Sequence, residues 1–99
     1  MNTISNIGKT YIFGLCEGRH SWPVKEGIFP HTVEHINDVQ LEDIAEKRIP
    51  ADCARLAVYV SGLTIAMLAV VKVCARRGIR LTAYHYNPTS NVFSKQEVL

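Results

Sequence analysis

One stretch of the sequence decides the fold: LAVYVSGLTIAMLAVVKVCARRGIRLTAYHY (Leu56–Tyr86). It begins with a near-continuous apolar run, Leu56–Val60, which predicts a strand of a parallel sheet that is covered on both faces. After a small, hydroxyl-bearing turn, Ile65–Arg77 predicts a helix that is apolar on most sides and must therefore be buried on most sides. Gly78 predicts the C-cap of this helix, and Ile79–Tyr86 predicts the next strand. The stretch therefore predicts a parallel βαβ unit with a right-handed crossover.

Before this stretch, the sequence predicts one more strand and one more helix. Tyr11–Leu15 combines β-branched and aromatic residues, which predicts a short buried strand. Cys16–Asn37 is punctuated by prolines and glycines, which predicts a loop. Val39–Ile49 spaces its apolar residues at helical intervals, and either Asn37 or Asp38 is expected to be the N-cap.

After this stretch, Asn87–Asn91 predicts a turn and Val92–Ser94 predicts a short antiparallel edge strand. The elements then follow the order β-α-β-α-β-β. We therefore expect an α/β fold, a minimal Rossmann-like layer whose sheet is mainly parallel and has one antiparallel edge strand.

The composition is typical of one small globular domain. The chain has 99 residues, of which 47% are hydrophobic and 20% charged, so intrinsic disorder over most of it is disfavoured. We expect a single domain over residues 1–99, with residues 1–9 as a flexible arm. A domain of this size has little room for a large cleft within one subunit. A site shared across a homodimer or a higher homo-oligomer would ease that limit.

Charge and cysteine content argue against several classes of function. Eleven basic residues against nine acidic ones give a net charge of +2, which argues against binding to long nucleic acid. Cys16, Cys53 and Cys74 are widely spaced, which predicts a reducing cytoplasm rather than a disulfide framework. The uncharged run Leu56–Val71 is shorter than the roughly 20 residues of a membrane-spanning helix and is interrupted by a Ser-Gly pair. We therefore expect no membrane partner.

The candidate ligand site lies beyond the carboxyl ends of the strands, where open α/β sheets bind their ligands. That edge is predicted to collect Gly14–His20, Ser61–Thr64 and Tyr84–Asn87. The second of these reads SGLT and opens a helix, so its free backbone N–H groups and the positive end of the helix dipole predict a site for an anion such as phosphate. The alternative is that Ser61 or Thr64 only caps the helix.

The stretch after the first strand carries four polar or reactive side chains, Cys16, Glu17, Arg19 and His20. Arg19 and His20 could contact a phosphate, and His20 could move a proton. The alternative is that both are solvated loop residues. Cys16-x3-His20 and His31-x3-His35 resemble zinc-ligand spacing, but no CxxC pair accompanies them. We therefore expect neither a metal nor another cofactor.

The stretch at the end of the last parallel strand reads YHYN (Tyr84–Asn87). Tyr84 and Tyr86 are expected to share one face of the sheet while His85 points to the other, because side chains alternate along a strand. A tyrosine at this edge could stack on a nucleobase, and His85 could bond a phosphate. The alternative is that the tyrosines are core residues with satisfied hydroxyl groups.

A resemblance to a known family rests on the run VYVSGLTIAM (Val58–Met67), followed by the apolar helix, Gly78 and the strand ending YHYN. This pattern resembles the CRISPR-associated Rossmann-fold (CARF) sensor domains and the small stand-alone ring nucleases related to them. It covers Leu56–Ser94, and the turn has one glycine where the family often has two. The resemblance implies a homodimer that binds a cyclic oligonucleotide across its two-fold axis, with Ser61–Thr64 and the loop after the first strand as walls of the site.

The resemblance also implies what happens to the messenger. Because we expect no effector domain on this chain, the messenger would be either sequestered or destroyed. Destruction of an RNA messenger needs no metal, since a 2′-hydroxyl held in line with the neighbouring phosphate can attack it while the protein supplies orientation and charge stabilisation. His20 and His85 are then the candidate acids, and Arg19 and the SGLT amides the charge stabilisers.

These patterns leave three hypotheses open. The first is binding or sequestration of a nucleotide second messenger, such as a cyclic oligonucleotide, in bacterial or phage defence or counter-defence. The second is a metal-independent ring nuclease, and the third is a small dimeric adaptor with no ligand, whose apolar helix docks a larger protein. The predicted ligand-binding residues are Gly14, Cys16, Glu17, Ser61, Gly62, Leu63, Thr64, Tyr84, Tyr86 and Asn87, and the predicted catalytic residues are His20, His85 and Arg19.

Overall fold

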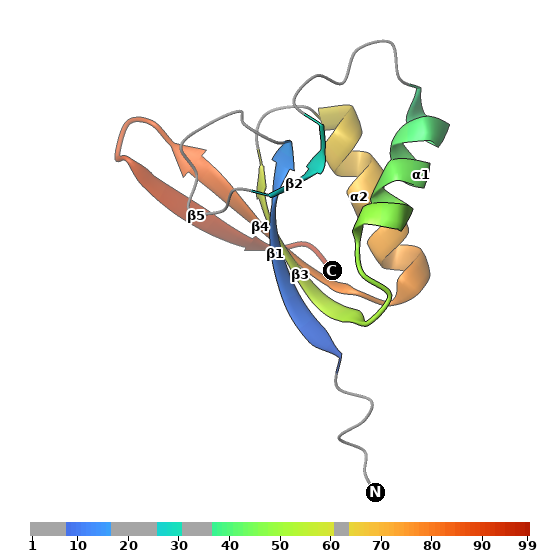
Figure 1. The fold of residues 1–99 in the computed structure, drawn as a ribbon. Helices are drawn as coiled ribbons and strands as arrows, with labels where there is room; N and C mark the ends of the chain where they lie inside the picture. The colour runs from blue at the N-terminus through green and yellow to red at the C-terminus, as the bar shows by residue number, and fades with distance from the viewer. Residues whose placement is uncertain (1–7, 17–25, 31–36, 61–63) are drawn as a thin grey trace, which may run out of the picture.

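A computed structural model describes residues 8–16, 26–30, 37–60 and 64–99 of the chain (Figure 1). Five strands and two helices lie within these residues. In chain order they are β1 (Lys9–Cys16), β2 (Gly27–Phe29), α1 (Asp38–Arg48), β3 (Cys53–Val60), α2 (Thr64–Arg77), β4 (Arg80–Asn87) and β5 (Val92–Glu97).

The strands form one sheet in the order β2-β1-β3-β4-β5. Neighbouring strands run parallel except β4 and β5, which are antiparallel. The predicted α/β fold, with a mainly parallel sheet and an antiparallel edge strand, is therefore confirmed. Strand β2 is an addition, because it lies within the segment for which the sequence predicted a loop, and β5 continues beyond the predicted Val92–Ser94.

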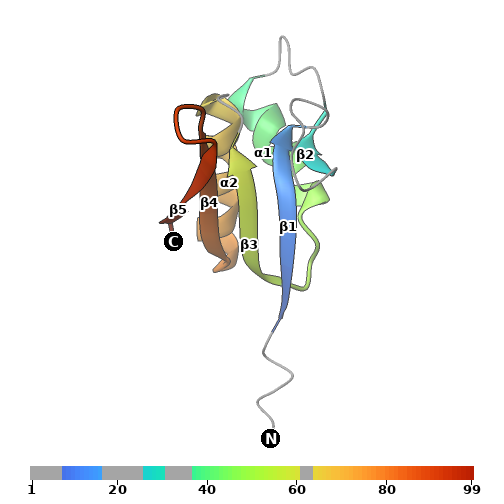
Figure 2. The same cartoon turned by 90° about the vertical axis from the view of Figure 1, so that its left-hand side faces the viewer.

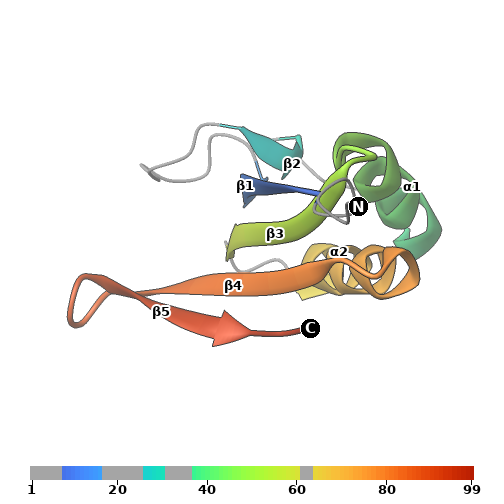
Figure 3. The same ribbon diagram turned by 90° about the horizontal axis from the view of Figure 1, so that it is seen from below.

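Both helices cover the same face of the sheet, as Figures 2 and 3 show. On β3, Leu56 and Val58 are buried beneath this helix layer, whereas Arg55, which directly precedes Leu56, is exposed. The expectation that this strand is covered on both faces is wrong. An apolar run predicts burial, but Ala57 and Tyr59 are only partly buried on the side away from the helices. The side of the sheet away from the helices is therefore partly exposed near the middle of the sheet.

Helix α1 begins at a capping box. The Asn37 side chain accepts a hydrogen bond from the Gln40 backbone N–H at 2.9 Å, and the Gln40 side chain accepts one from the Asn37 backbone N–H at 3.2 Å. Each bond satisfies a backbone donor at the helix start. Of the two predicted N-caps, Asn37 is the one observed.

Helix α2 ends as the sequence predicts. Gly78 adopts a positive φ of 69°, and the Ile79 backbone N–H donates to the Cys74 carbonyl at 2.9 Å. A residue with a side chain would be strained in this left-handed conformation, which explains the glycine. The helix buries one side against the sheet, but Leu68 on its outer side is 54% exposed. The expectation that α2 is buried on most sides is therefore wrong, because the helix is buried on the side toward the sheet and exposes Leu68 on its outer side.

The two helices are joined by charged side chains. Arg76 of α2 contacts Glu42 of α1 at 2.7 Å and Glu46 at 3.0 Å, and Lys72 contacts Glu42 at 3.5 Å. The hydrogen bond from Arg76 lowers the pKa of Glu42 below its ordinary value, and the nearby charge of Lys72 acts in the same direction.

We expect the ion pair of Glu42 with Arg76 to make the stability of the fold depend on pH in the acidic range. A carboxylate with a depressed pKa adds stability above its unfolded pKa and loses that contribution as the pH falls through its folded pKa. The thermal midpoint should therefore fall between about pH 5 and pH 3, and it should fall less in Glu42→Gln. Asp43→Asn, on the solvent side of α1, is the control. Equal acid dependence of Glu42→Gln and the wild type would contradict this assignment.

Candidate functional site

Three parallel strands and one helix meet at the candidate site. Strands β1, β3 and β4 end at the same edge of the sheet, at Cys16, Val60 and Asn87, and α2 begins with Thr64 beyond β3 (Figure 2). This is the edge that the sequence predicted. Six predicted site residues lie outside the described residues, namely Glu17, Arg19, His20, Ser61, Gly62 and Leu63.

An aromatic cluster lies at this edge, on the side of the sheet away from the helices. It consists of Tyr59, Tyr84, Tyr86 and Phe93. The rings of Tyr59 and Tyr84 are stacked, with centroids 5.0 Å apart and planes 17° apart, and Phe93 meets Tyr59 edge-on at 5.0 Å. Phe93 is 36% exposed and Tyr86 is 45% exposed. The cluster therefore presents aromatic surface to solvent.

The strand register explains why these rings meet. Tyr59 pairs with Tyr84 across the parallel strands β3 and β4, and Tyr86 pairs with Phe93 across the antiparallel hairpin. Directly paired side chains lie on the same face of a sheet and contact one another. The Tyr86 hydroxyl also donates to Asn91 Oδ1 at 2.6 Å, which fixes the tyrosine against the hairpin turn.

The same register places basic side chains on this face. Arg55 pairs with Arg80, in line with the Tyr59 and Tyr84 pair, because β3 reads RLAVY and β4 reads RLTAY from these arginines. We call this side of the sheet the open face. Its side chains are Thr10, Ile12, Arg55, Ala57, Tyr59, Arg80, Thr82, Tyr84, Tyr86, Phe93, Lys95 and Glu97.

His85 lies on the side of β4 opposite to Tyr84 and Tyr86, as expected. Its ring nitrogen Nε2 is 2.8 Å from Gln96 Oε1. Gln96 pairs with Ala83, a buried residue on the helix-facing side, so both polar groups share that side. A ligand on the aromatic cluster would have to pass around the end of β4 to contact His85.

The remaining predicted residues lie at the edge in different environments. Gly14 pairs with Tyr59 and is buried, and Cys16 at the end of β1 is 2% exposed. Asn87 is used by the hairpin, because its Oδ1 accepts a hydrogen bond from the Thr89 backbone N–H at 3.0 Å. Thr64 is exposed at the start of α2. The structure therefore brings Gly14 and Tyr84 close to Tyr59.

Sequence reasoning missed Tyr59, Phe93 and the two arginines. The apolar run predicts that Tyr59 lies in a strand covered on both faces, and Phe93 belongs to a predicted edge strand to which the sequence gives no role. A signal was present in the sequence, because Arg55, Ala57 and Tyr59 stand at alternate positions, as do Arg80, Thr82 and Tyr84, although Arg55 lies just before the predicted strand Leu56–Val60. Side chains at alternate positions share a face.

Cys53 and Cys74 do not supply a reactive thiol. Cys16, Cys53 and Cys74 are buried, and none of the three is bonded to another cysteine. Burial raises the pKa of Cys74 to about 12 and raises the pKa of Cys53 as well. A thiol is nucleophilic as the thiolate, so neither of these two is activated at neutral pH. Within residues 8–16, 26–30, 37–60 and 64–99, no three His, Cys, Asp or Glu side chains gather as a metal site.

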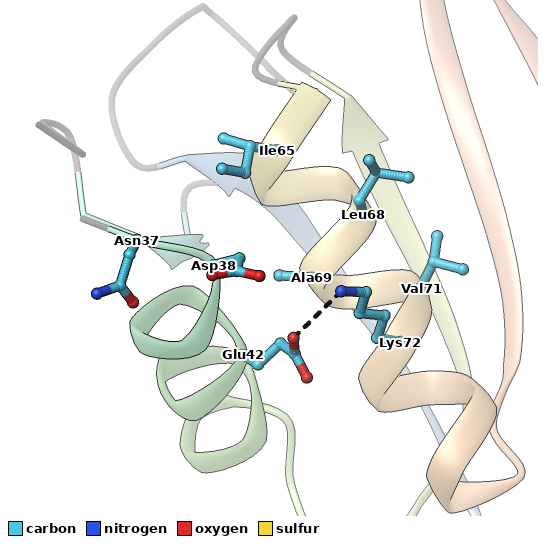
Figure 4. A pocket seen from close by; sticks show the side chains of 8 residues that line it. All are labelled: Asn37, Asp38, Glu42, Ile65, Leu68, Ala69, Val71 and Lys72. Carbon is cyan, nitrogen blue, oxygen red and sulfur yellow. Dashed lines mark hydrogen bonds and ion pairs between the residues drawn. The ribbon is translucent and has the colours of Figure 1, made fainter. Parts of the chain in front are cut away.

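A groove of about 550 Å³ separates the outer sides of the two helices (Figure 4). Ile65, Leu68 and Val71 of α2 line one side, and Glu42 of α1 lines the other, where it meets Lys72. This groove lies on the far side of the molecule from the open face. In the part of the chain that the structure describes, neither helix is long and apolar enough to cross a membrane.

Comparison of the chain with protein-family models, with curated proteins and with solved structures gave no match. The structure is that of a small α/β domain with a Rossmann-like arrangement and a mostly parallel five-stranded sheet. The resemblance to CARF domains is supported only to that extent.

Proposed function

We propose that this protein binds a nucleotide second messenger, such as a cyclic oligonucleotide, at the carboxyl edge of its sheet. The observation that carries the proposal is the aromatic cluster beside this edge, with Tyr59 and Tyr84 stacked and Phe93 against them. Stacking on an aromatic side chain is sequence-tolerant and stabilises a bound base by about 1–3 kcal/mol.

The phosphates of such a ligand have a separate place at the same edge. Helix α2 begins at Thr64, the last residue of the SGLT stretch, and the backbone N–H groups of a helix start attract anions. A ligand with its base on the aromatic cluster and its phosphate toward Thr64 uses both chemistries of a nucleotide. The resemblance to CARF domains points to the same ligand class and to a role in bacterial or phage defence or counter-defence.

A homodimer is part of this proposal. Ile65 and Leu68 expose apolar surface on α2, and they line the groove between the helices. Exposed apolar surface of this kind marks protein contacts. A second copy that covers this groove leaves the open face accessible, because the two lie on opposite sides of the sheet.

The test is retention of a ligand from a panel of cyclic di-, tri-, tetra- and hexanucleotides. A bound messenger at a hundredfold excess over its dissociation constant should stabilise the native state by about 2.7 kcal/mol, seen as a raised thermal midpoint. Chromatography of the ligand released by heat then identifies it, and sedimentation of the same samples reports the dimer. Intact ligand supports binding, and linear products assign a ring nuclease instead.

Variants connect the result to the site. Tyr59→Ala should weaken retention about 5- to 150-fold because a stacked base is lost. Tyr59→Phe keeps the ring and should retain the ligand. If no cyclic nucleotide raises the thermal midpoint or is recovered, the proposed function is wrong and the adaptor hypothesis is favoured.

A further inference from the structure

We infer that the open face binds a single-stranded nucleic acid whose bases stack on the aromatic cluster and whose phosphates lie over the paired arginines, Arg55 and Arg80. This inference rests on the proposed function in one respect, since the aromatic cluster receives bases in both cases. It extends the ligand class from a small messenger to a strand that runs along β3 and β4.

The first observation that supports this inference is the positive charge of the open face. Arg55 and Arg80 are exposed and side by side in register, and Lys95 pairs with Tyr84 in the row of the aromatic cluster. Among the residues that the structure describes, none of these three cations meets a carboxylate. The acid on this face, Glu97, accepts a hydrogen bond from Thr82 Oγ1 at 2.7 Å.

The small net charge of the chain does not reflect the basic character of the open face, because many of the acidic residues lie elsewhere. Helix α1, behind the sheet, carries four of the nine acidic residues, Asp38, Glu42, Asp43 and Glu46. Two of them, Glu42 and Glu46, pair with basic residues of α2. The basic residues of the open face are therefore left to act on a ligand. Phosphates bound by such residues provide a large share of the affinity for nucleic acid.

The spacing of the arginines and tyrosines along β3 and β4 favours a nucleic-acid strand over a single nucleotide as the ligand. Tyr59 lies four positions after Arg55, and Tyr84 lies four positions after Arg80, which corresponds to about 13 Å at a rise of about 3.3 Å per residue. The base and the phosphate of one nucleotide do not reach both rows. Successive nucleotides of a strand do, with the small side chains of Ala57 and Thr82 between the two rows.

The same charges disfavour a second copy on this face. Counting the described residues, packing two open faces together would bury three cations of each copy, Arg55, Arg80 and Lys95, against one acid, Glu97, from each. Buried charges without partners are costly. A strand of nucleic acid brings one negative charge per nucleotide and flat bases, so it complements both the cations and the rings.

The experiment measures fluorescence anisotropy of labelled oligouridine and oligothymidine strands of about ten nucleotides, within the range of known single-strand sites. With three cations in contact, the logarithm of affinity should fall with the logarithm of salt concentration with a slope of about −2.1. Arg55→Ala/Arg80→Ala should reduce this slope to about −0.7. Tyr59→Ala/Phe93→Ala should lower affinity at least about 5-fold with an unchanged slope.

A matched control distinguishes binding at the open face from a general effect of the net charge. Lys47→Ala/Lys72→Ala removes the same charge from the helix layer, where these lysines pair with Asp43 and Glu42. It should leave the affinity for the nucleic-acid strand unchanged.

The comparison of RNA with DNA shows which groups of the ligand are recognised. Tighter binding of RNA would indicate contact with the 2′-hydroxyl, and equal binding would indicate that bases and phosphates alone are recognised. Either result supports the inference. An unchanged thermal midpoint verifies that each variant is folded.

Several outcomes overturn the inference. These are absence of strand binding, duplex binding as tight as single-strand binding, or an equal loss in the lysine control. Dimerisation that is lost in Tyr59→Ala, without strand binding, would assign the face to a second copy. Retention of a cyclic nucleotide without strand binding overturns this inference alone. Strand binding without retention of any cyclic nucleotide overturns the proposed function alone.

Discussion

Replacing Ile28 with alanine is expected to lower the free energy of unfolding by about 2–5 kcal/mol, because the change removes a buried side chain and leaves a cavity. Ile28 is the middle residue of β2 and is only 1% exposed. Strand β2 pairs with β1 and contacts α1, so Ile28 is part of the core that holds the end of β1 in place. Chemical denaturation of the purified variant measures the effect.

The matched control for this prediction is Ile12→Ala on β1. The substitution is chemically identical, but Ile12 is 52% exposed on the open face. Substitutions of exposed residues usually change stability by no more than about 0.5 kcal/mol. Equal effects at Ile12 and Ile28 would show that β2 behaves as a surface loop, which is what the sequence predicted for it.

Replacing Arg77 with alanine is expected to cost about 2–3 kcal/mol of stability, because part-buried carbonyls lose a charged donor. The Arg77 guanidinium donates to the Ile49 carbonyl at 3.1 Å and to the Pro50 carbonyl at 2.6 Å. It also lies 3.4 Å from a Glu46 carboxylate oxygen. It thereby ties the end of α2 to the segment that connects α1 to β3. Thermal and urea denaturation measure the loss.

The neighbouring arginine provides the comparison. Among the described residues, Arg76 bonds only to the carboxylates of Glu42 and Glu46, and it is half-exposed, so Arg76→Ala should destabilise the protein less than Arg77→Ala. Arg77→Lys retains the charge but cannot donate to both carbonyls in the same fork, and it should recover only part of the loss. A larger effect at Arg76 than at Arg77 would contradict the role assigned to the carbonyl contacts.

The sequence by itself determined the elements whose signals are local. The sequence limited the N-cap of α1 to Asn37 or Asp38. The glycine at position 78 and the apolar run of β3 also depend on residues close in the chain, and each element was predicted near its observed place. Alternation along a strand also placed Tyr84 and His85 on opposite faces. The carboxyl edge followed from the parallel βαβ order, which is a rule of connection.

Only the tertiary structure decided which face of the sheet is covered and which residues meet on the other face. Strand β2 is too short to stand out from the prolines and glycines around it, and its pairing with β1 is a contact between distant residues. The aromatic cluster depends on register, since Tyr59 meets Tyr84 and Phe93 only because three strands align. Register and burial are set by the packing of the whole sheet, so an apolar run cannot specify them.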